Sequence, residues 1–293
     1  MSKDNDMQHL RGWVESALET YLSMAGEAAP QLGEAMRYSA LDGGKRLRPI
    51  LCLAACDAAG GQPERAMPAA CAVEMIHCYS LIHDDLPAMD DDDLRRGRPA
   101  THRAFGEAMA ILAGDALLTM AFEIVSRDTR GLPPDTVLEL VTTIARGAGP
   151  AGMVAGQVLD LQAEGNQAHL AYLEDMHRRK TGALIWAAVR SGGLVSGCGP
   201  DVLGALESYA AELGLLYQIT DDLLDLEGEE AVIGKPTGSD QANDKLTYPS
   251  LLGVERSREM IQNSAARARR ALEIIPSPGL LVHILDLVVA RDR

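Results

Sequence analysis

The sequence is poor in aromatic residues and in basic residues. Phe, Trp and Tyr make up only 4% of its 293 residues, and Ala and Leu prevail over Val and Ile. This composition favours helices and argues against a fold built of strands. The 27 Lys and Arg residues are outnumbered by 42 Asp and Glu residues, which leaves a net charge of −15. A surface this acidic repels polyanions, so we expect no nucleic acid partner.

Cysteines are few, and their pattern excludes a disulfide framework. The five cysteines are an odd number and include no C-x-x-C pair, and most have the spacing of buried helix positions. The polar N-terminal residues do not resemble a signal peptide, and no apolar run reaches the roughly 20 residues of a membrane span. We therefore expect reduced thiols, a cytoplasmic location and no membrane insertion.

Apolar residues recur with helical periodicity along almost the whole chain, and Gly and Pro cluster between the periodic segments. No linker, fixed-period repeat or alternating strand pattern interrupts them. We expect a single all-α domain over residues 1–293 with ten or more helices, of which the most apolar are central. Two loops stand out, at residues 86–100 and 227–244.

The segment HDDLPAMDDDDLRRG, residues 83–97, contains six aspartates within ten positions. Carboxylates packed this closely repel one another, and ionised groups near apolar surface are costly. Pro87 should end the preceding apolar helix near Asp85, so that Asp90 can curl back toward Asp84. The negative end of the helix dipole adds to the repulsion there, which favours a bound cation.

A second acidic group lies in LGLLYQITDDLLDL, residues 213–226, where Gln218, Asp221, Asp222 and Asp225 span an arc of about 100°. Three carboxylates on an otherwise apolar helix are costly to bury unpaired, although a solvated outer face is the simpler alternative. Carboxylate oxygens suit hard cations. Two sparse sites facing one cavity fit Mg²⁺ with a phosphorylated substrate better than Ca²⁺, which prefers six to eight ligands.

Basic residues stand in tight groups beside these segments. GGKRLRP, residues 43–49, opens a predicted helix whose N-terminus and glycine backbone favour an anion. Any single basic residue can be an ordinary surface charge, but together they can hold one diphosphate directly and a second through Mg²⁺. The candidates are Lys45, Arg46, Arg48, Arg95, Arg96, Lys180, Lys235 and Lys245. Gln157 and Asp160 share a helical face and are weighed equally as site residues and as ordinary exposed polar residues.

These motifs occur in an order that resembles the trans-isoprenyl diphosphate synthases over essentially the whole chain. The resemblance is carried by the two aspartate segments, by GGKRLRP, by KTG at residues 180–182 and by GKPTGSD at residues 234–240. The proline within the first aspartate motif is similar to the bacterial-type farnesyl diphosphate synthases. The resemblance implies antiparallel helices around a deep apolar cavity, a homodimer, and about three Mg²⁺ ions as the metal cofactor.

The resemblance also implies roles for individual residues. Asp84, Asp85 and Asp90 would hold two Mg²⁺ ions, and Asp221, together with Asp222 and Asp225, would hold the third. The residues implied to contact the allylic diphosphate are Arg95, Lys180, Thr181, Gln218, Lys235 and Lys245. Those implied to contact isopentenyl diphosphate are Lys45, Arg48, His77 and Arg96. The residues expected to carry catalysis are Asp84, Asp90, Arg95, Lys180 and Asp221.

The length of the product depends on how deep its tail can run beside the helix before Asp84. Tyr79 and Ser80 precede Asp84 by five and four residues, which places them about 6–7.5 Å deeper at 1.5 Å per residue. A bulky Tyr79 can form the floor, which in this family indicates a C15 product, whereas a smaller residue indicates C20. An ordinary core tyrosine is the alternative.

We therefore expect a Mg²⁺-dependent prenyltransferase that condenses isopentenyl diphosphate with dimethylallyl or geranyl diphosphate to give farnesyl diphosphate. A geranylgeranyl diphosphate synthase is the near rival, and the size of the product distinguishes the two. A non-catalytic Ca²⁺-binding helical protein is the rival of another class, but it leaves the basic groups unexplained. A terpene cyclase would share one acidic motif and would rarely carry both together with GGKRLRP.

Overall fold

The periodic segments form helices in the computed structural model, which describes residues 3–129, 131–163, 169–227 and 246–290. Within these residues the only strands are a pair of two-residue strands, so the all-α prediction is confirmed. The elements are α1 (Lys3–Met24), α2 (Pro30–Ala40), α3 (Leu47–Ala58), α4 (Pro63–Asp84), β1 (Leu94–Arg95), β2 (Arg98–Pro99), α5 (Thr101–Phe105), α6 (Glu107–Asp128), α7 (Pro134–Ala148), α8 (Met153–Ala163), α9 (Leu170–His177), the π-helical turn η1 (Arg178–Gly182), α10 (Ala183–Ser196), α11 (Pro200–Glu227), α14 (Tyr248–Leu252), α15 (Val254–Ala271), the 3-10 turn η2 (Leu272–Ile274) and α16 (Gly279–Ala290).

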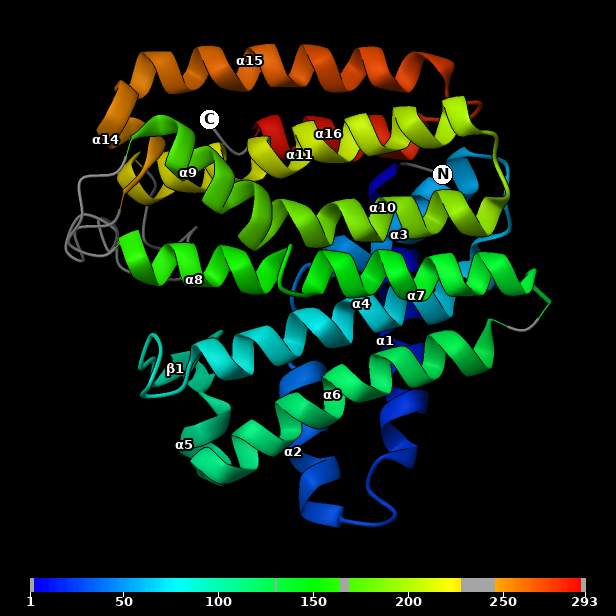
Figure 1. Cartoon of the computed structure of the whole chain (residues 1–293), viewed down its shortest axis with the longest axis vertical. Helices are drawn as coiled ribbons and strands as arrows, with labels where there is room; N and C mark the ends of the chain where they lie inside the picture. Colours follow the sequence, from blue (N-terminus) through cyan, green and yellow to red (C-terminus); the bar gives the residue numbers. More distant parts are fainter. Residues whose placement is uncertain (1–2, 130, 164–168, 228–245, 291–293) are drawn as a thin grey trace.

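The helices are arranged in layers around α3, α4 and α10 (Figure 1). One apolar cluster gathers side chains mainly of α1, α2, α4, α6 and α7, and a second gathers those of α11, α15 and α16. Helices α3 and α10 contribute to both clusters, which explains why their sequences are apolar on more than one side. They approach each other closely at Gly192, where a Cβ would lie 2.1 Å from the carbonyl oxygen of Cys52.

The outward face of α6 is unusually apolar. Ile111 is 44% exposed and Leu112 is 53% exposed. Within the described residues, α6 is also the one helix long and apolar enough to cross a membrane by length and composition. It packs against α4 and α2, however, and a core helix of a bundle meets the same criteria. The composition of α6 is therefore weak evidence for a membrane span.

A buried ion pair joins the start of α3 to the middle of α4. Arg46 caps α3 with a left-handed backbone (φ 50°), and its Nη1 donates to Glu74 Oε1 at 2.8 Å. Its Nη2 donates to the carbonyl oxygen of Ala40 at 2.8 Å, and the side chains of Arg46 and Glu74 are 0% and 3% exposed. The pair therefore fixes the loop between α2 and α3, which carries the GGKRLRP segment.

We expect Glu74→Ala to lower the free energy of unfolding by about 3–5 kcal/mol, because it leaves the buried guanidinium of Arg46 without its carboxylate. Urea unfolding followed by circular dichroism measures the change. The matched control is Glu259→Ala, which breaks an exposed pair with Arg256 and should change stability by less than about 0.5 kcal/mol. Equal unfolding midpoints for the two variants would contradict a stabilising role for the buried pair.

Candidate active site

The chain reverses direction directly after α4 and brings the first acidic motif together. The helix ends at Asp84, and Asp85 is its C-cap, as the position of Pro87 predicts. The backbone N–H of Asp90 then donates to the carbonyl oxygen of Asp84 at 2.9 Å. This hydrogen bond confirms that the chain curls back, so two aspartates six residues apart meet at the carboxyl end of α4.

Burial makes the charge on Asp84 unfavourable. It raises the pKa of Asp84 to about 6, and the neighbouring Asp90 adds to the rise, while Lys180 and Arg95 oppose it. A divalent cation between Asp84 and Asp90 would relieve this cost, and their oxygen donors suit Mg²⁺. Among the residues that the structure describes, no three His, Cys, Asp or Glu side chains converge into a ready-made metal cluster. Mg²⁺ typically takes one or two carboxylates and completes its shell with water and phosphate oxygens, so Asp84 and Asp90 would be enough protein ligands for it.

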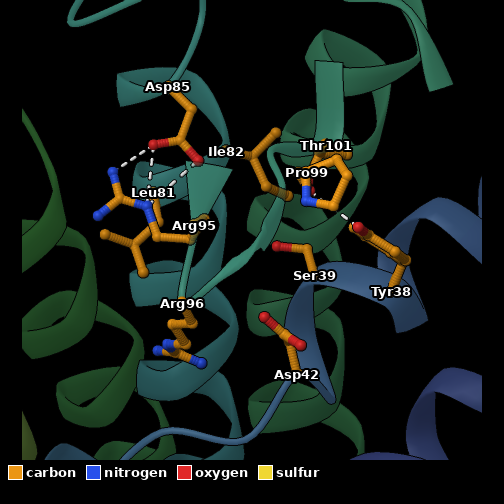
Figure 2. A pocket seen from close by; sticks show the side chains of 10 residues that line it. All are labelled: Tyr38, Ser39, Asp42, Leu81, Ile82, Asp85, Arg95, Arg96, Pro99 and Thr101. Carbon is orange, nitrogen blue, oxygen red and sulfur yellow. Dashed lines mark hydrogen bonds and ion pairs between the residues drawn. The ribbon is translucent and has the colours of Figure 1, made fainter. Parts of the chain in front are cut away.

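Asp85, next to this pair in the sequence, binds Arg95 of β1 (Figure 2). The Nε of Arg95 lies 2.9 Å from Asp85 Oδ1, its Nη2 also bonds Asp85, and Nη2 reaches Asp92 Oδ2 at 3.3 Å. Burial raises the pKa of Asp85, although Arg95 lowers it in part. Asp85 therefore orients Arg95 here, and its expected metal role stays a prediction.

The strands β1 and β2 form a hairpin that connects two parts of the site. Leu94 pairs with Pro99 and Arg95 with Arg98, so Arg96 and Gly97 alone form the turn. Both have positive φ, 53° and 78°, as a type I′ turn requires. Arg96 Nη1 donates to the carbonyl oxygen of Gly43 at 2.7 Å.

Gly44 leaves room for the guanidinium of Arg96. A Cβ at Gly44 would lie 2.7 Å from Arg96 Nη2, so any larger residue would have to displace the arginine. The glycine pair in GGKRLRP thus allows the side chain of Arg96 to approach the backbone of this segment closely.

A cluster of cationic side chains surrounds His77 on α4. Burial lowers the pKa of His77 well below its usual value, and the charges of Arg48, Arg96, Arg46 and Arg95 lower it further. His77 is therefore neutral in a strongly positive environment. The Nε of Arg48 is buried and has no hydrogen-bond partner among the described residues, and burial lowers the pKa of Arg48. Lys45 is exposed at the edge of this cluster. The arrangement has the charge and the open donors to bind an anion.

Lys180 and Thr181 belong to the π-helical turn η1, an irregularity that often marks functional sites. Lys180 Nζ lies 2.5 Å from Asp160 Oδ2. Burial alone would lower the pKa of Lys180, but Asp160, Asp84 and Asp90 raise it. The ammonium therefore faces the first acidic motif. Thr181 Oγ1 donates to Gln218 Oε1 of α11 at 2.7 Å, so these two predicted residues are also brought together.

The second acidic motif on α11 divides into two parts. Asp222 is buried, and its Oδ2 accepts a hydrogen bond from the backbone N–H of Tyr248 at 2.9 Å, where α14 begins. Asp222 therefore holds α14, and its expected share with Asp221 and Asp225 in the third metal site stays a prediction. Asp221 is exposed and Asp225 half-buried. Burial raises the pKa of Tyr217, Asp221 raises it further and Arg48 opposes the rise, so Asp221 and the cationic cluster face a common side chain.

Tyr79 lines neither of two cavities that lie within the described part of the chain. One of about 550 Å³ lies between α1, α2 and α6. The other, of about 20 Å³, is shown in Figure 2 and is lined by Tyr38, Ser39, Asp42, Leu81, Ile82, Asp85, Arg95, Arg96, Pro99 and Thr101.

Tyr79 is 8% exposed, and its ring meets the ring of His83 edge-on with centroids 5.7 Å apart. Ser80 Oγ donates to the carbonyl oxygen of His77 at 2.8 Å. Their roles in setting product length stay predictions. Lys235 and Lys245 lie outside the described residues.

The sequence patterns leave the role of Asp160 open between a site residue and an ordinary exposed polar residue. The structure makes it the partner of Lys180. Glu74 gave a usable signal, because it is the one acidic residue in the long apolar part of α4. Nothing in the sequence signals the contacts that hold the hairpin, because they join residues about 60 positions apart.

A helical bundle in which carboxylates and cations face one another at the end of α4, and which carries a second acidic motif on α11, has the features of a metal-assisted diphosphate enzyme. The sequence model of the Polyprenyl synthetase family matches residues 29–275. The chain belongs to this family. It is accordingly a prenyltransferase of isoprenoid synthesis, a group whose members generally use Mg²⁺.

Individual relatives cover nearly the whole chain. The farnesyl diphosphate synthase of Geobacillus stearothermophilus is 49% identical over 282 residues, which are 96% of this chain and 95% of that protein. The geranylgeranyl diphosphate synthase of Cyanophora paradoxa is 44% identical over 262 residues, 89% of this chain and 87% of that protein. Among solved structures, the FPP/GFPP synthase of Zymomonas mobilis superposes with a TM-score of 0.87 at 36% identity and covers 98% of both chains.

His177, which precedes the π-helical turn, makes stability depend on pH. It is 7% exposed, burial lowers its pKa to about 4, and Lys180 lowers it further while Asp160 opposes the shift. The unfolded chain takes up this proton near pH 6.5 and the folded state only near pH 4. The stability due to His177 is therefore complete above pH 6.5 and is lost as the pH falls toward 4.

We expect His177→Gln to lose about 3 kcal/mol less stability than the parent protein between pH 7 and pH 4, because a glutamine takes up no proton in the unfolded state. Urea unfolding at a series of pH values measures the difference. The exposed His9 provides the control, since His9→Gln should follow the parent curve. Parallel curves for His177→Gln and the parent would contradict this assignment.

Proposed function

We propose that this protein is a farnesyl diphosphate synthase that condenses isopentenyl diphosphate with dimethylallyl diphosphate and then with geranyl diphosphate. One observation carries the proposal. Arg95 and Lys180 both act on Asp84 of the first acidic motif, while Arg48 and Arg96 surround His77 two turns earlier on α4. Two separate cationic groups beside one metal-binding motif are what two diphosphate substrates require.

The reaction begins when the C–O bond of the allylic diphosphate breaks and its electron pair leaves with the diphosphate oxygen. Arg95 and Lys180 stabilise the charge that grows on this leaving group. When bound, Mg²⁺ supplies further electrostatic stabilisation of the same diphosphate. Asp84, Asp85 and Asp90 would hold two ions and Asp221 a third, about three in all.

The double bond of isopentenyl diphosphate then attacks C1 of the allylic cation, and a C–C bond forms. Lys45, Arg48, His77 and Arg96 hold the diphosphate of this second substrate. The cation that results loses a proton to the departed diphosphate, so no strongly basic side chain is needed. Thr181 and Gln218 orient oxygen atoms toward the cation, and apolar walls keep out water that would quench it. Lys235 and Lys245 complete the contacts to the allylic substrate.

The C15 product is favoured over C20 by Tyr79. Sequence identity alone does not decide between a C15 and a C20 product. A geranylgeranyl pyrophosphate synthase large subunit of Arabidopsis thaliana is also 49% identical to this chain, although over 83% of its length. In this proposal a lengthening tail runs down α4 until it meets the nearly buried ring of Tyr79. It is the floor that stops growth after two condensations.

The wider proposal concerns the organisation of the enzyme. Residues 1–293 form one catalytic domain in the cytoplasm, without membrane insertion. The exposed apolar residues of α6, Ile111 and Leu112 among them, are covered in a homodimer.

The direct test is an incubation of the purified protein with Mg²⁺, labelled isopentenyl diphosphate and each allylic diphosphate in turn, with the products sized by chromatography. We expect farnesyl diphosphate from both dimethylallyl and geranyl diphosphate, and no product after chelation of the metal. A C20 main product would establish the geranylgeranyl rival. Ca²⁺ binding without any turnover would instead favour a non-catalytic helical protein.

We expect Tyr79→Ala to shift the main product from C15 toward C20, because it removes the ring that limits the tail. Conversely, Ser80→Phe should shorten the product toward C10. The control is Tyr21→Ala, which removes a half-buried tyrosine of α1 and should leave the product length unchanged. Retention of the C15 product in Tyr79→Ala would show that another side chain forms the floor.

A further inference from the structure

The hairpin that carries Arg96 is too small to hold its own shape. Each strand has two residues, and an isolated two-stranded hairpin is at best marginally stable in water. Leu94 at its edge is 61% exposed, so burial does not fix it either. Contacts with the rest of the protein must therefore set the position of the turn at Arg96.

The carboxyl end of α2 and the residues after it provide these contacts. Tyr38 Oη donates to the carbonyl oxygen of Pro99 at 2.8 Å, as Figure 2 shows. Arg98 Nη1 donates to Asp42 Oδ1 at 2.5 Å, and its guanidinium carbon lies 4.2 Å from the centre of the Tyr38 ring. The Tyr38 ring itself stands edge-on against Phe105, with centroids 5.2 Å apart.

We propose that Tyr38, Asp42 and Arg98 form a clasp that positions Arg96 for the diphosphate of isopentenyl diphosphate. Arg98 and Arg96 flank Gly97 in the hairpin, and their partners Asp42 and Gly43 are adjacent in the α2–α3 loop. The clasp thus fixes the turn and its arginine on the loop that carries Lys45. The inference rests on the proposed function, in which Arg96 binds this substrate.

The clasp is separate from the contacts of the neighbouring Arg95, which Asp85 and Asp92 hold from the other side. Loss of the clasp should therefore affect isopentenyl diphosphate and spare the allylic substrate. The clasp also contributes little to folding, because Arg98 is 48% exposed and exposed ion pairs stabilise proteins only weakly. A defect in substrate binding can accordingly be separated from a defect in folding.

The test compares steady-state kinetics of Arg98→Ala with those of the parent enzyme. We expect the KM for isopentenyl diphosphate to rise roughly tenfold, since small misplacement of a binding group is costly, while the KM for geranyl diphosphate changes by less than about twofold. Arg98→Lys keeps a cation opposite Asp42 and should restore most of the affinity. The control Arg267→Ala removes an arginine that is 47% exposed and paired with Glu212, and should change neither constant.

A double variant tests whether the clasp acts through Arg96. Arg96→Asn removes the guanidinium and keeps a residue that tolerates positive φ in the turn. Arg98→Ala should raise the KM for isopentenyl diphosphate in the parent background and add less than about twofold in the Arg96→Asn background. The proposal would be overturned if the two substitutions had additive effects on the KM for isopentenyl diphosphate. It would also be overturned if Arg96→Asn raised this KM and Arg98→Ala left it unchanged. Absence of turnover in the parent protein would instead refute the proposed function, and equal kinetics for Arg96→Asn and the parent would refute the role of Arg96.

Discussion

The repulsion among carboxylates at the carboxyl end of α4 is the constraint on which the site depends. Asp84 is costly to ionise there, because it is partly buried, faces Asp90 and lies at the negative end of a helix. The charge is balanced in part by Lys180 from the π-helical turn, which is distant in the sequence, and by Arg95 from the hairpin that follows α4. These two cations do not restore the ordinary pKa of Asp84, so a metal ion, as the proposed function requires, would lower the cost further.

The rest of the structure keeps these groups in place. Helices α3 and α10 separate the two apolar clusters, so neither α4 nor α11 can shift without disturbing a packed layer. The ion pair of Arg46 and Glu74 ties the GGKRLRP loop to the same helix that ends in Asp84. Asp222 performs a similar task on α11 by binding the first backbone N–H of α14. Several charged residues near the site, Arg46, Glu74 and Asp222 among them, thus hold the framework in place.

The sequence predicted the features that follow from local rules and missed those that need tertiary contacts. Helical periodicity and the effect of Pro87 were sufficient to predict α4, its end and the return of Asp90. Periodicity could not distinguish Asp222 from Asp221, because adjacent positions on a helix differ by about 100° and only the location of α14 decides which one is buried. Periodicity also gave no indication that Asp85 would pair with Arg95, because that ion pair depends on how the hairpin folds back.

The adjacent arginines in the first acidic segment show how one short hairpin can send neighbouring side chains to different parts of the site. Arg95 belongs to β1 and reaches Asp85 (Figure 2), whereas Arg96 belongs to the turn and reaches the carbonyl oxygen of Gly43. Arg95 stands at the end of a strand, whereas Arg96 has the positive φ of the turn, 53°, so the hairpin directs two neighbouring cations to different partners. The proposed function depends on this separation, because it assigns the two arginines to two different diphosphates.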